Sequence, residues 1–172
     1  MSQVVKFKKL HPQATLPKYQ TKFASGFDFH ALVVEEDGAS IKVPVRQENG
    51  SFIMSPPSLI INPKMQAIIR TGLAMVLPEG YEMQIRPRSS WAMKNMLTIT
   101  NSPGTIDQDF RGEIMVILIN HGYEPMRIEH GVRIAQGVVQ QVEQYEIVEI
   151  ADFSEEDISI DRGGGLGSTG IK

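Results

Sequence analysis

The sequence predicts an all-β, antiparallel fold of the jelly-roll type, a distorted barrel or sandwich with one short helix. Short segments that are apolar, or that alternate between apolar and polar residues, recur along the chain between turn-forming residues. The clearest breaks are residues 78–80 (PEG), 120–122 (NHG) and 130–131 (HG). No segment keeps a convincing helical period over ten or more residues. Many short strands joined by tight turns are typical of barrels and sandwiches.

Seven segments have the composition of strands. In chain order they are residues 4–10, 27–34, 66–77, 81–85, 113–120, 132–142 and 145–150. The one helix is expected around residues 90–95, where serine residues at its start can cap the first turn.

Residues 37–58 are expected to form an inserted β-hairpin. The segments 42–45 (KVPV) and 51–54 (SFIM) flank residues 48–50 (ENG), and Asn-Gly is a preferred hairpin turn. Residues 162–170 are rich in glycine and are expected to form a flexible tail. The predicted organisation is therefore one domain over residues 1–161, which includes the inserted hairpin, and a tail over residues 162–172.

Composition excludes several classes of function. The 172 residues are 41% apolar and 22% charged, which suits one ordinary globular domain. No apolar run is long enough to span a membrane, and the first residues, MSQVVKFKKL, lack a signal-peptide core. A net charge of −3 offers no basic surface for general nucleic-acid binding. Cysteine is absent, which fits a reducing compartment. We expect a cytoplasmic protein that binds neither membranes nor nucleic acids.

Residues 105–113 (TIDQDFRGE) are the most informative segment. They hold two carboxylates, an aromatic ring and an arginine, after a Pro-Gly turn at 103–104 and before the apolar run 114–119. The pattern predicts a hairpin at a strand edge that presents a carboxylate to a small ligand. Aspartate and glycine are also ordinary turn residues, so this segment alone leaves both interpretations open.

Five segments resemble, in sequence order, the five motifs of the trimeric dUTP diphosphatases. They are residues 24–28 (ASGFD), 86–90 (RPRSS) with Lys94, 101–113 (NSPGTIDQDFRGE), 131–136 (GVRIAQ) and 162–170 (RGGGLGSTG). One such motif would be weak, whereas five in order cover nearly the whole chain. The resemblance implies a jelly-roll enzyme that hydrolyses dUTP to dUMP and pyrophosphate, by attack of water on the α-phosphorus. That reaction keeps uracil out of DNA and supplies dUMP for dTMP synthesis.

The resemblance also assigns the groups that act on the phosphates. Asp107 is the general base that orients and deprotonates the attacking water. Arg88, Ser89 and Ser90 hold the phosphates through charged side-chain contacts and backbone amides, and Gln136 also reaches them. The tail closes over the γ-phosphate and excludes bulk water. Its expected contacts are Arg162, Leu166, Gly167, Ser168 and Thr169.

A cation and a shared site follow from the same resemblance. It implies one Mg²⁺ held by phosphate oxygens and water, with no direct protein ligand, and Asp28 as an indirect support nearby. In the family one subunit gives the substrate hairpin, a second gives Arg88, Ser89 and Gln136, and a third lends its tail. We therefore expect a homotrimer with three composite sites.

Uracil presents an N3–H donor between two carbonyl acceptors. By resemblance it pairs with Asn101 and with backbone groups of residues that follow it, which are Gly104, Thr105, Ile106 and Met115. A site built for this pattern rejects cytosine, because its polar groups would be left unpaired. Phe110 stands where the family has a tyrosine whose ring packs on the deoxyribose and leaves no room for a 2′-hydroxyl.

Two further positions depart from the family. Leu166 replaces the phenylalanine that stacks on uracil, so stacking should be weaker. Ser90 replaces a glycine and crowds the phosphate turn.

Two other functions compete with this one. dCTP deaminase shares the fold and an RSS sequence, but it needs a glutamate where Ile117 stands and an arginine where Met93 stands. The main alternative is a nucleotide-sensing regulatory protein of the same fold, which contacts an unidentified protein through the 37–58 insertion. Release of pyrophosphate from dUTP distinguishes an enzyme from such a binder.

Overall fold

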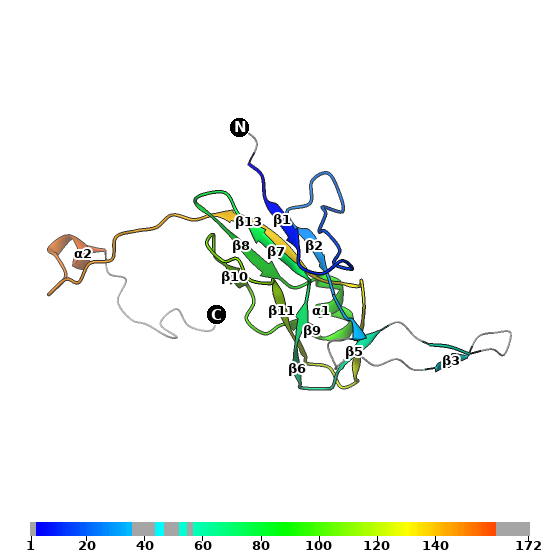
Figure 1. Cartoon of the computed structure of the whole chain (residues 1–172). Coiled ribbons are helices and arrows are strands. Elements are labelled where there is room, and N and C mark those ends of the chain that lie inside the picture. Colours follow the sequence, from blue (N-terminus) through cyan, green and yellow to red (C-terminus); the bar gives the residue numbers. More distant parts are fainter. Residues whose placement is uncertain (1–2, 36–43, 47–51, 55–56, 161–172) are drawn as a thin grey trace. The chain divides into compact units, whose positions relative to one another are not determined.

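The computed structural model describes residues 3–35, 44–46, 52–54 and 57–160, which form short strands, turns and two short helices (Figure 1). The strands are β1 (Lys6–Lys9), β2 (Phe27–His30), β3 (Pro44–Arg46), β4 (Phe52–Met54), β5 (Ser58–Ile61), β6 (Gln66–Arg70), β7 (Leu73–Val76), β8 (Tyr81–Arg86), β9 (Leu97–Ile99), β10 (Gly104–Ile106), β11 (Met115–Asn120), β12 (Met126–Glu129) and β13 (Arg133–Gln141). The helices are α1 (Ser89–Asn95), at the predicted place, and α2 (Glu155–Ser159).

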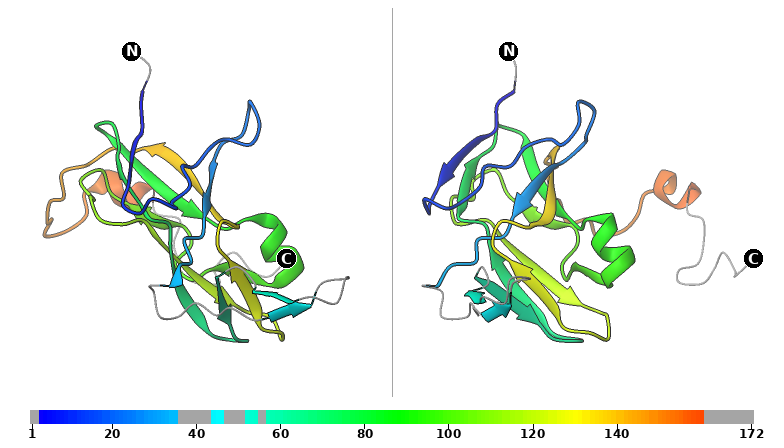
Figure 2. Two further views of the ribbon diagram at one scale, coloured as in Figure 1. Left: turned by 45° about the vertical axis from the view of Figure 1, so that its right-hand side comes forward. Right: turned by 90° about the vertical axis from the view of Figure 1, so that its right-hand side faces the viewer.

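Every strand pair among the described residues is antiparallel, as the sequence predicts. The largest sheet has the order β10-β8-β13-β2, and a second has the order β6-β11-β9. Three further pairs are β1-β7, β12-β5 and β3-β4. Figure 2 shows the same strands from two other sides. The four-stranded sheet matters most here, because each of its strands carries or adjoins a predicted site residue.

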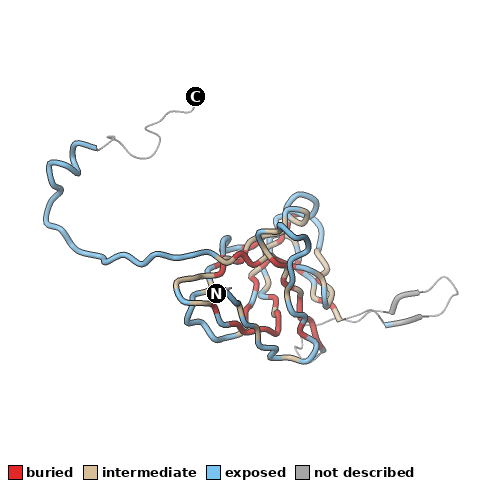
Figure 3. Tube along the Cα trace, turned by 90° about the horizontal axis from the view of Figure 1, so that it is seen from above, coloured by how far each residue is buried: buried red, intermediate tan, exposed pale blue. Residues whose placement is uncertain are grey.

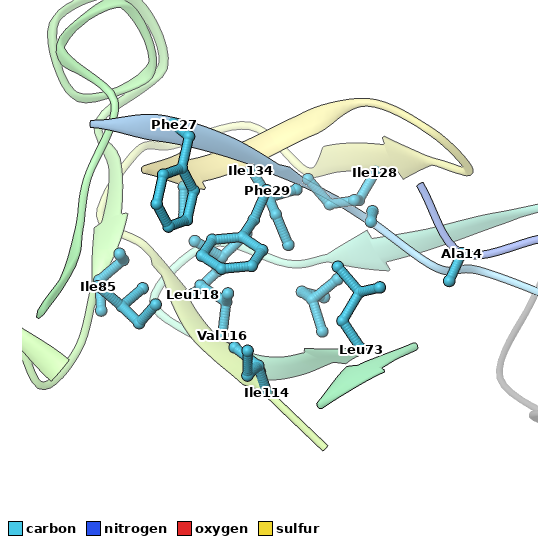
Figure 4. Packing of buried hydrophobic residues seen from close by; sticks show 14 of the residues in the cluster. Ala14, Phe27, Phe29, Leu73, Ile85, Ile114, Val116, Leu118, Ile128 and Ile134 are labelled. Carbon is cyan, nitrogen blue, oxygen red and sulfur yellow. The ribbon is translucent and has the colours of Figure 1, made fainter. Parts of the chain in front are cut away.

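Buried side chains alternate with more exposed ones along the strands, and the buried ones form the core (Figure 4). In β2, Phe27 and Phe29 are buried, whereas Asp28 and His30 are half-buried on the opposite face. The rings of Tyr19 and Phe27 pack edge-on with centroids 5.4 Å apart. Figure 3 shows the buried residues, in red, gathered in the compact body of the chain. This packing fixes β2 so that Asp28 points to the side of the strand opposite Phe27 and Phe29.

Two predicted segments need correction in this part of the chain, and four short strands were not predicted. Residues 66–77 form two strands, β6 and β7, with a break at Thr71 and Gly72. Gly72 has a φ of +68°, and a Cβ there would lie 2.8 Å from the Cβ of Ala14, so only glycine fits. Residues 105–113 do not form a two-stranded hairpin, because β10 pairs with β8, while β11 pairs with β6 and β9. The short strands β5, β9, β10 and β12 are additional.

The insertion contains the predicted hairpin pairing, in which β3 and β4 align Val45 with Ile53. Its Asn-Gly turn lies outside the described residues. No helix in the described part of the chain is long and apolar enough to cross a membrane.

The chain divides into two compact units, Met1–Val142 and Glu143–Lys172. In the second unit the prediction of a strand at residues 145–150 is wrong, since they form no strand and Ile147 is 97% exposed. Helix α2 begins with a capping box in which Ser154 and Asp157 bond each other's backbone N–H. Hydrogen bonds to the Asp157 carboxylate, first from the Ser154 hydroxyl and then from the Ser154 backbone N–H, lower the pKa of Asp157. The predicted tail at residues 162–172 lies outside the described residues.

Candidate functional site

Asp28 and two arginines form an ionic cluster where β2 and β13 meet the start of α1. Asp28 Oδ2 lies 3.1 Å from Arg133 Nη1, and Asp28 Oδ1 lies 3.6 Å from Arg88 Nε. The Asp28 side chain is only 13% exposed, and the Arg88 side chain 19%. Because the carboxylate is largely removed from water, its two cationic partners offset the cost of burying its charge.

Arg88 is held in place yet keeps one group for a ligand. Its Nη1 donates to the backbone oxygen of Arg133 at 2.9 Å, and its Nε faces Asp28. Its Nη2 makes no hydrogen bond to any other described residue. Arg88 is also the N-cap residue of α1, so the side chain and the first turn of the helix share one location. Ser89, which is exposed, and Ser90, which is half-buried, lie in that first turn.

Gln136 joins this cluster from β13. The strand register places it opposite Asp28 on one side and opposite Arg86 on the other. Its Nε2 donates to the backbone oxygen of Pro87 at 3.0 Å. A Cβ on Gly26 would lie 3.0 Å from both Gln136 Oε1 and the backbone oxygen of Gly137. The glycine of the first motif therefore permits the close approach of β13 to the chain before β2.

His30 lies two residues beyond Asp28 on the same face of β2. Burial lowers the pKa of His30 below its ordinary value. Asp28 opposes this shift, and the cationic groups of Arg133, Lys18 and Arg88 add to it. His30 is therefore neutral at physiological pH and adds no charge to the cluster.

A second group of predicted residues lies on the loop between β10 and β11. Asp107 is exposed, and its carboxylate makes no hydrogen bond or ion pair with another described residue. A turn follows it, in which the N–H of Phe110 donates to the oxygen of Asp107 at 3.1 Å. The Phe110 ring lies over Gly112, where a Cβ would approach its Cζ to 2.7 Å. An exposed carboxylate is thus presented beside an aromatic ring.

Asn101 and Gly104 lie together at the start of β10. A Cβ on Gly104 would be 3.2 Å from the Asn101 side-chain nitrogen, so the amide rests on the glycine backbone. Thr105 is exposed and Ile106 half-buried on the same strand. Met115, at the start of β11, is 48% exposed. The amide and the backbone groups of β10 form a polar edge that suits a planar base.

The structure brings Asp28, Arg88 and Gln136 together but separates them from Asp107. Strand β10 pairs with β8 from Gly104 opposite Ile85 to Ile106 opposite Met83, so it runs away from the end of β8 that leads to Arg88. Asp107 follows Ile106, so the same register sets it level with Glu82 of β8. Glu82 lies six residues before Arg88 in the chain. At about 3.3 Å per residue this separation is roughly 15–20 Å. A single chain therefore does not place Asp107 beside its own Arg88.

Sequence reasoning missed several residues that shape the site. Arg133 stands inside the fourth motif, but only the strand register places it opposite His30 and beside Asp28. Gln108 and Glu113 anchor the Asp107 loop, and no sequence pattern marks their partners. Arg111 was recognised within the loop, yet its contacts to the backbone oxygens of the turn were not.

Comparisons with known proteins decide the family. A sequence model of the family named dUTPase matches residues 38–170. The chain belongs to the dUTPase family. It is 44% identical over 167 residues to the deoxyuridine 5'-triphosphate nucleotidohydrolase of Nautilia profundicola, covering 96% of this chain and 98% of that protein. It is 42% identical over 174 residues to the enzyme of the same name from Wolinella succinogenes, covering 99% of both chains.

Solved structures of dUTPases have the same fold. A variant dUTPase of Staphylococcus bacteriophage 80alpha aligns with a TM-score of 0.74 at 22% identity, over 98% of this chain and 100% of that one. Another variant of the phage enzyme, solved with dUpNHpp, gives 0.72 at 22% identity, over 98% and 99%. The jelly-roll prediction is confirmed. Membership of the dUTPase family supports dUTP hydrolysis as the activity and does not favour the regulatory alternative.

Proposed function

We propose that this dUTPase hydrolyses dUTP at a composite site in which Asp107 activates water on phosphate groups held by Arg88 of another subunit. The observation that carries this proposal is the pairing of an exposed, unpaired Asp107 with a distant, pre-oriented Arg88. A positioned general base typically contributes about 10²–10⁴-fold in rate.

The ionic cluster supplies the phosphate-binding groups. Arg88 Nη2 is available for a charge-assisted hydrogen bond to a phosphate. Asp28 and the backbone oxygen of Arg133 fix the orientation of the guanidinium group. Ser89 and Ser90 contribute hydroxyl and amide donors from the first turn of α1. Gln136, tied to Pro87, completes this set. Pre-orientation reduces the entropy lost when the phosphates bind.

The polar edge of β10 is proposed to select the base. Asn101 and the backbone of Gly104, Thr105 and Ile106 pair with uracil, with Met115 at the start of the adjoining strand β11. Phe110 packs on the deoxyribose. The ring is packed over Gly112, which supports a fixed ring position, and we propose that in this position it leaves no room for a 2′-hydroxyl.

Magnesium would be bound mainly through the substrate. The described residues contain no group of three His, Asp or Glu side chains arranged to hold a metal ion, and the Asp28 carboxylate is engaged by two arginines. This donor set fits Mg²⁺ that keeps phosphate oxygens and water as ligands, with Asp28 as an indirect support. When bound, Mg²⁺ supplies positive charge that offsets the charge of the triphosphate.

A homotrimer is proposed as the form that completes the site. Besides the separation of Asp107 from Arg88, the outer face of β6 and β11 supports association. Ile68 is 60% exposed and pairs with the half-buried Ile117. Exposed apolar residues on one sheet face are typical of an interface between copies.

Three further parts of the proposal rest on the sequence. The tail would close the site through Arg162, Leu166, Gly167, Ser168 and Thr169. The 37–58 insertion would contact an additional protein, and the enzyme would act in the cytoplasm.

Replacement of Asp107 tests the chemistry. Asp107→Asn should keep the fold and nucleotide binding but lose at least about 10²-fold in kcat, because an amide cannot accept the proton. Pyrophosphate release from dUTP with Mg²⁺ is the assay, and binding of a non-hydrolysable dUTP analogue is the control. Near-normal turnover in this variant would refute the general-base assignment.

Mixing two inactive variants tests the shared site. An Asp107→Asn chain keeps Arg88, and an Arg88→Ala chain keeps Asp107. In randomly mixed trimers, the subunit that gives the loop has an intact Asp107 in about half of the sites, and its neighbour has an intact Arg88 in about half. About one site in four therefore has both groups intact. Activity should therefore recover to about a quarter of the normal value after joint refolding. If each site comes from one chain, mixing restores nothing.

A further inference from the structure

The loop that carries Asp107 is attached to the rest of the protein by very few contacts. Residues 107–112 are all exposed. Most of the hydrogen bonds they make are internal: the N–H of Phe110 donates to the oxygen of Asp107, and Arg111 Nη1 donates to the oxygens of Gln108 and Phe110 at 2.6 and 2.9 Å. These bonds set the shape of the turn. They do not fix where the turn lies on the protein.

One hydrogen bond does fix it. The backbone N–H of Gly80 donates to Gln108 Oε1 at 3.0 Å. Among the described residues it is the only hydrogen bond from residues 107–112 to another part of the chain. Gln108 is adjacent to Asp107, so the bond acts one residue from the carboxylate.

Gly80 is a firm anchor. It lies in the turn that leads into β8, and its φ of +77° is a left-handed conformation that favours glycine. Its oxygen accepts a hydrogen bond from the N–H of Val142 at 2.8 Å, just after β13. β8 in turn pairs with both β10 and β13. The peptide group that follows Gly80 is therefore held at the end of the central sheet, and the peptide group before it is the one that donates to Gln108.

The other end of the loop has a separate anchor. The Glu113 carboxylate accepts from the N–H of Gly72 at 2.8 Å and from Arg70 Nε at 3.1 Å. Its side chain is 17% exposed. Glu113 thus secures the entry to β11, six residues beyond Asp107, and leaves the tip of the turn dependent on Gln108.

We propose that Gln108 is a positioning residue, which holds the Asp107 turn at the distance from the phosphates that proton transfer requires. This inference rests on the proposed role of Asp107. Gln108 itself touches no reacting atom. Its loss would let the turn move within its open surroundings, so the fraction of molecules with a correctly placed base would fall while nucleotide binding remained.

The expected effect is in turnover. A hydrogen bond of this kind typically shifts a conformational equilibrium by about two- to tenfold. Gln108→Ala should lower kcat about three- to tenfold and leave KM for dUTP within about twofold. Gln108→Glu keeps an oxygen that can accept from Gly80. At pH 8, well above the ordinary pKa of a carboxyl group, it should recover kcat to within about twofold of the unmodified enzyme. Gln140→Ala, at an exposed glutamine on β13, is the matched control and should change neither constant.

The experiment compares these variants with Asp107→Asn and with the double variant that carries both Gln108→Ala and Asp107→Asn. If Gln108 acts through Asp107, its replacement costs nothing further once Asp107 is gone. An unchanged kcat in Gln108→Ala, or an equal loss in the Asp107→Asn background, would overturn the inference while leaving the general base intact. Near-normal turnover of Asp107→Asn would instead overturn the proposed function and this inference with it.

Discussion

Asp28→Asn tests the ionic cluster most directly. The change keeps the size of the side chain but replaces one carboxylate oxygen with an amide NH₂ and removes the charge. That NH₂ must face either Arg133, whose Nη1 is 3.1 Å from Oδ2, or Arg88, whose Nε is 3.6 Å from Oδ1. Either orientation sets a donor against a donor and leaves two positive charges near each other without their shared counter-ion.

The magnitude follows from the burial of the group. Asp28 and Arg88 are 13% and 19% exposed, but Arg133 is 42% exposed, so only part of the cluster is removed from water. A hydrogen bond to a charged group contributes about 1.5–3 kcal/mol, and we expect Asp28→Asn to lower the free energy of unfolding by that amount. For a chain of this size the melting temperature should fall by about 3–12 °C.

Urea unfolding at fixed protein concentration is the assay, since the association that we propose would make the apparent stability concentration-dependent. Asp109→Asn makes the same chemical change at an exposed position and should stay within about 0.5 kcal/mol of the unmodified protein. The loss at Asp28 should persist in 0.5 M salt, because a largely buried pair is poorly screened. If Asp28→Asn is as stable as Asp109→Asn, the cluster does not stabilise the fold and the reasoning fails.

Two further predictions concern neighbouring residues. Gly112→Ala places a methyl group 2.7 Å from Phe110 Cζ, so the ring must move. The preference for dUTP over UTP, measured as a ratio of kcat/KM values, should then fall about tenfold. An unchanged ratio would show that Phe110 does not exclude the 2′-hydroxyl. The folded protein holds the pKa of His30 below its ordinary value of 6.5, so the unfolded chain takes up this proton first as the pH falls, and stability decreases below about pH 6.5. His30→Gln should remove that part of the decrease between pH 7.5 and 5.5, and equal slopes in the two proteins would contradict it.

The sequence predicted the elements whose patterns are local. Phe27 and Phe29 alternate with polar residues, and the structure buries them as a half-buried strand requires. Strands β9 and β10, with three residues each, are too short to show a period. The segment 145–150 has a strand-like composition, yet Ile147 is almost fully exposed because no neighbouring strand pairs with it within the described residues. A sequence pattern predicts which side chains a strand would bury, but a strand forms only where another segment of the chain lies beside it to accept and donate its backbone hydrogen bonds.

Some site residues were likewise predicted from local motifs, whereas others depend on which strands pair. Asp28, Arg88 and Gln136 were expected near the phosphates because of the motif resemblance, and the structure places them in one cluster. Arg133 was missed as a member of that cluster because it is 105 residues from Asp28 in sequence, and only the register of β13 against β2 brings the two together. The tail residues lie outside the described part of the chain and remain predictions.

The two halves of the site differ in how firmly they are built, and this difference has a consequence for catalysis. Arg88 and Gln136 are half-buried and bonded to backbone oxygens of neighbouring elements, so the groups we propose to bind the phosphates are set by the fold itself. Asp107 is exposed on a loop whose tip, within the part of the chain that the structure describes, is hydrogen-bonded to another segment only through Gln108 and Gly80. Binding should therefore survive changes that loosen the loop, whereas turnover should not, because proton transfer needs the base within hydrogen-bond reach of the water. Since the register separates Asp107 from its own Arg88, the homotrimer we propose would supply the last part of that alignment.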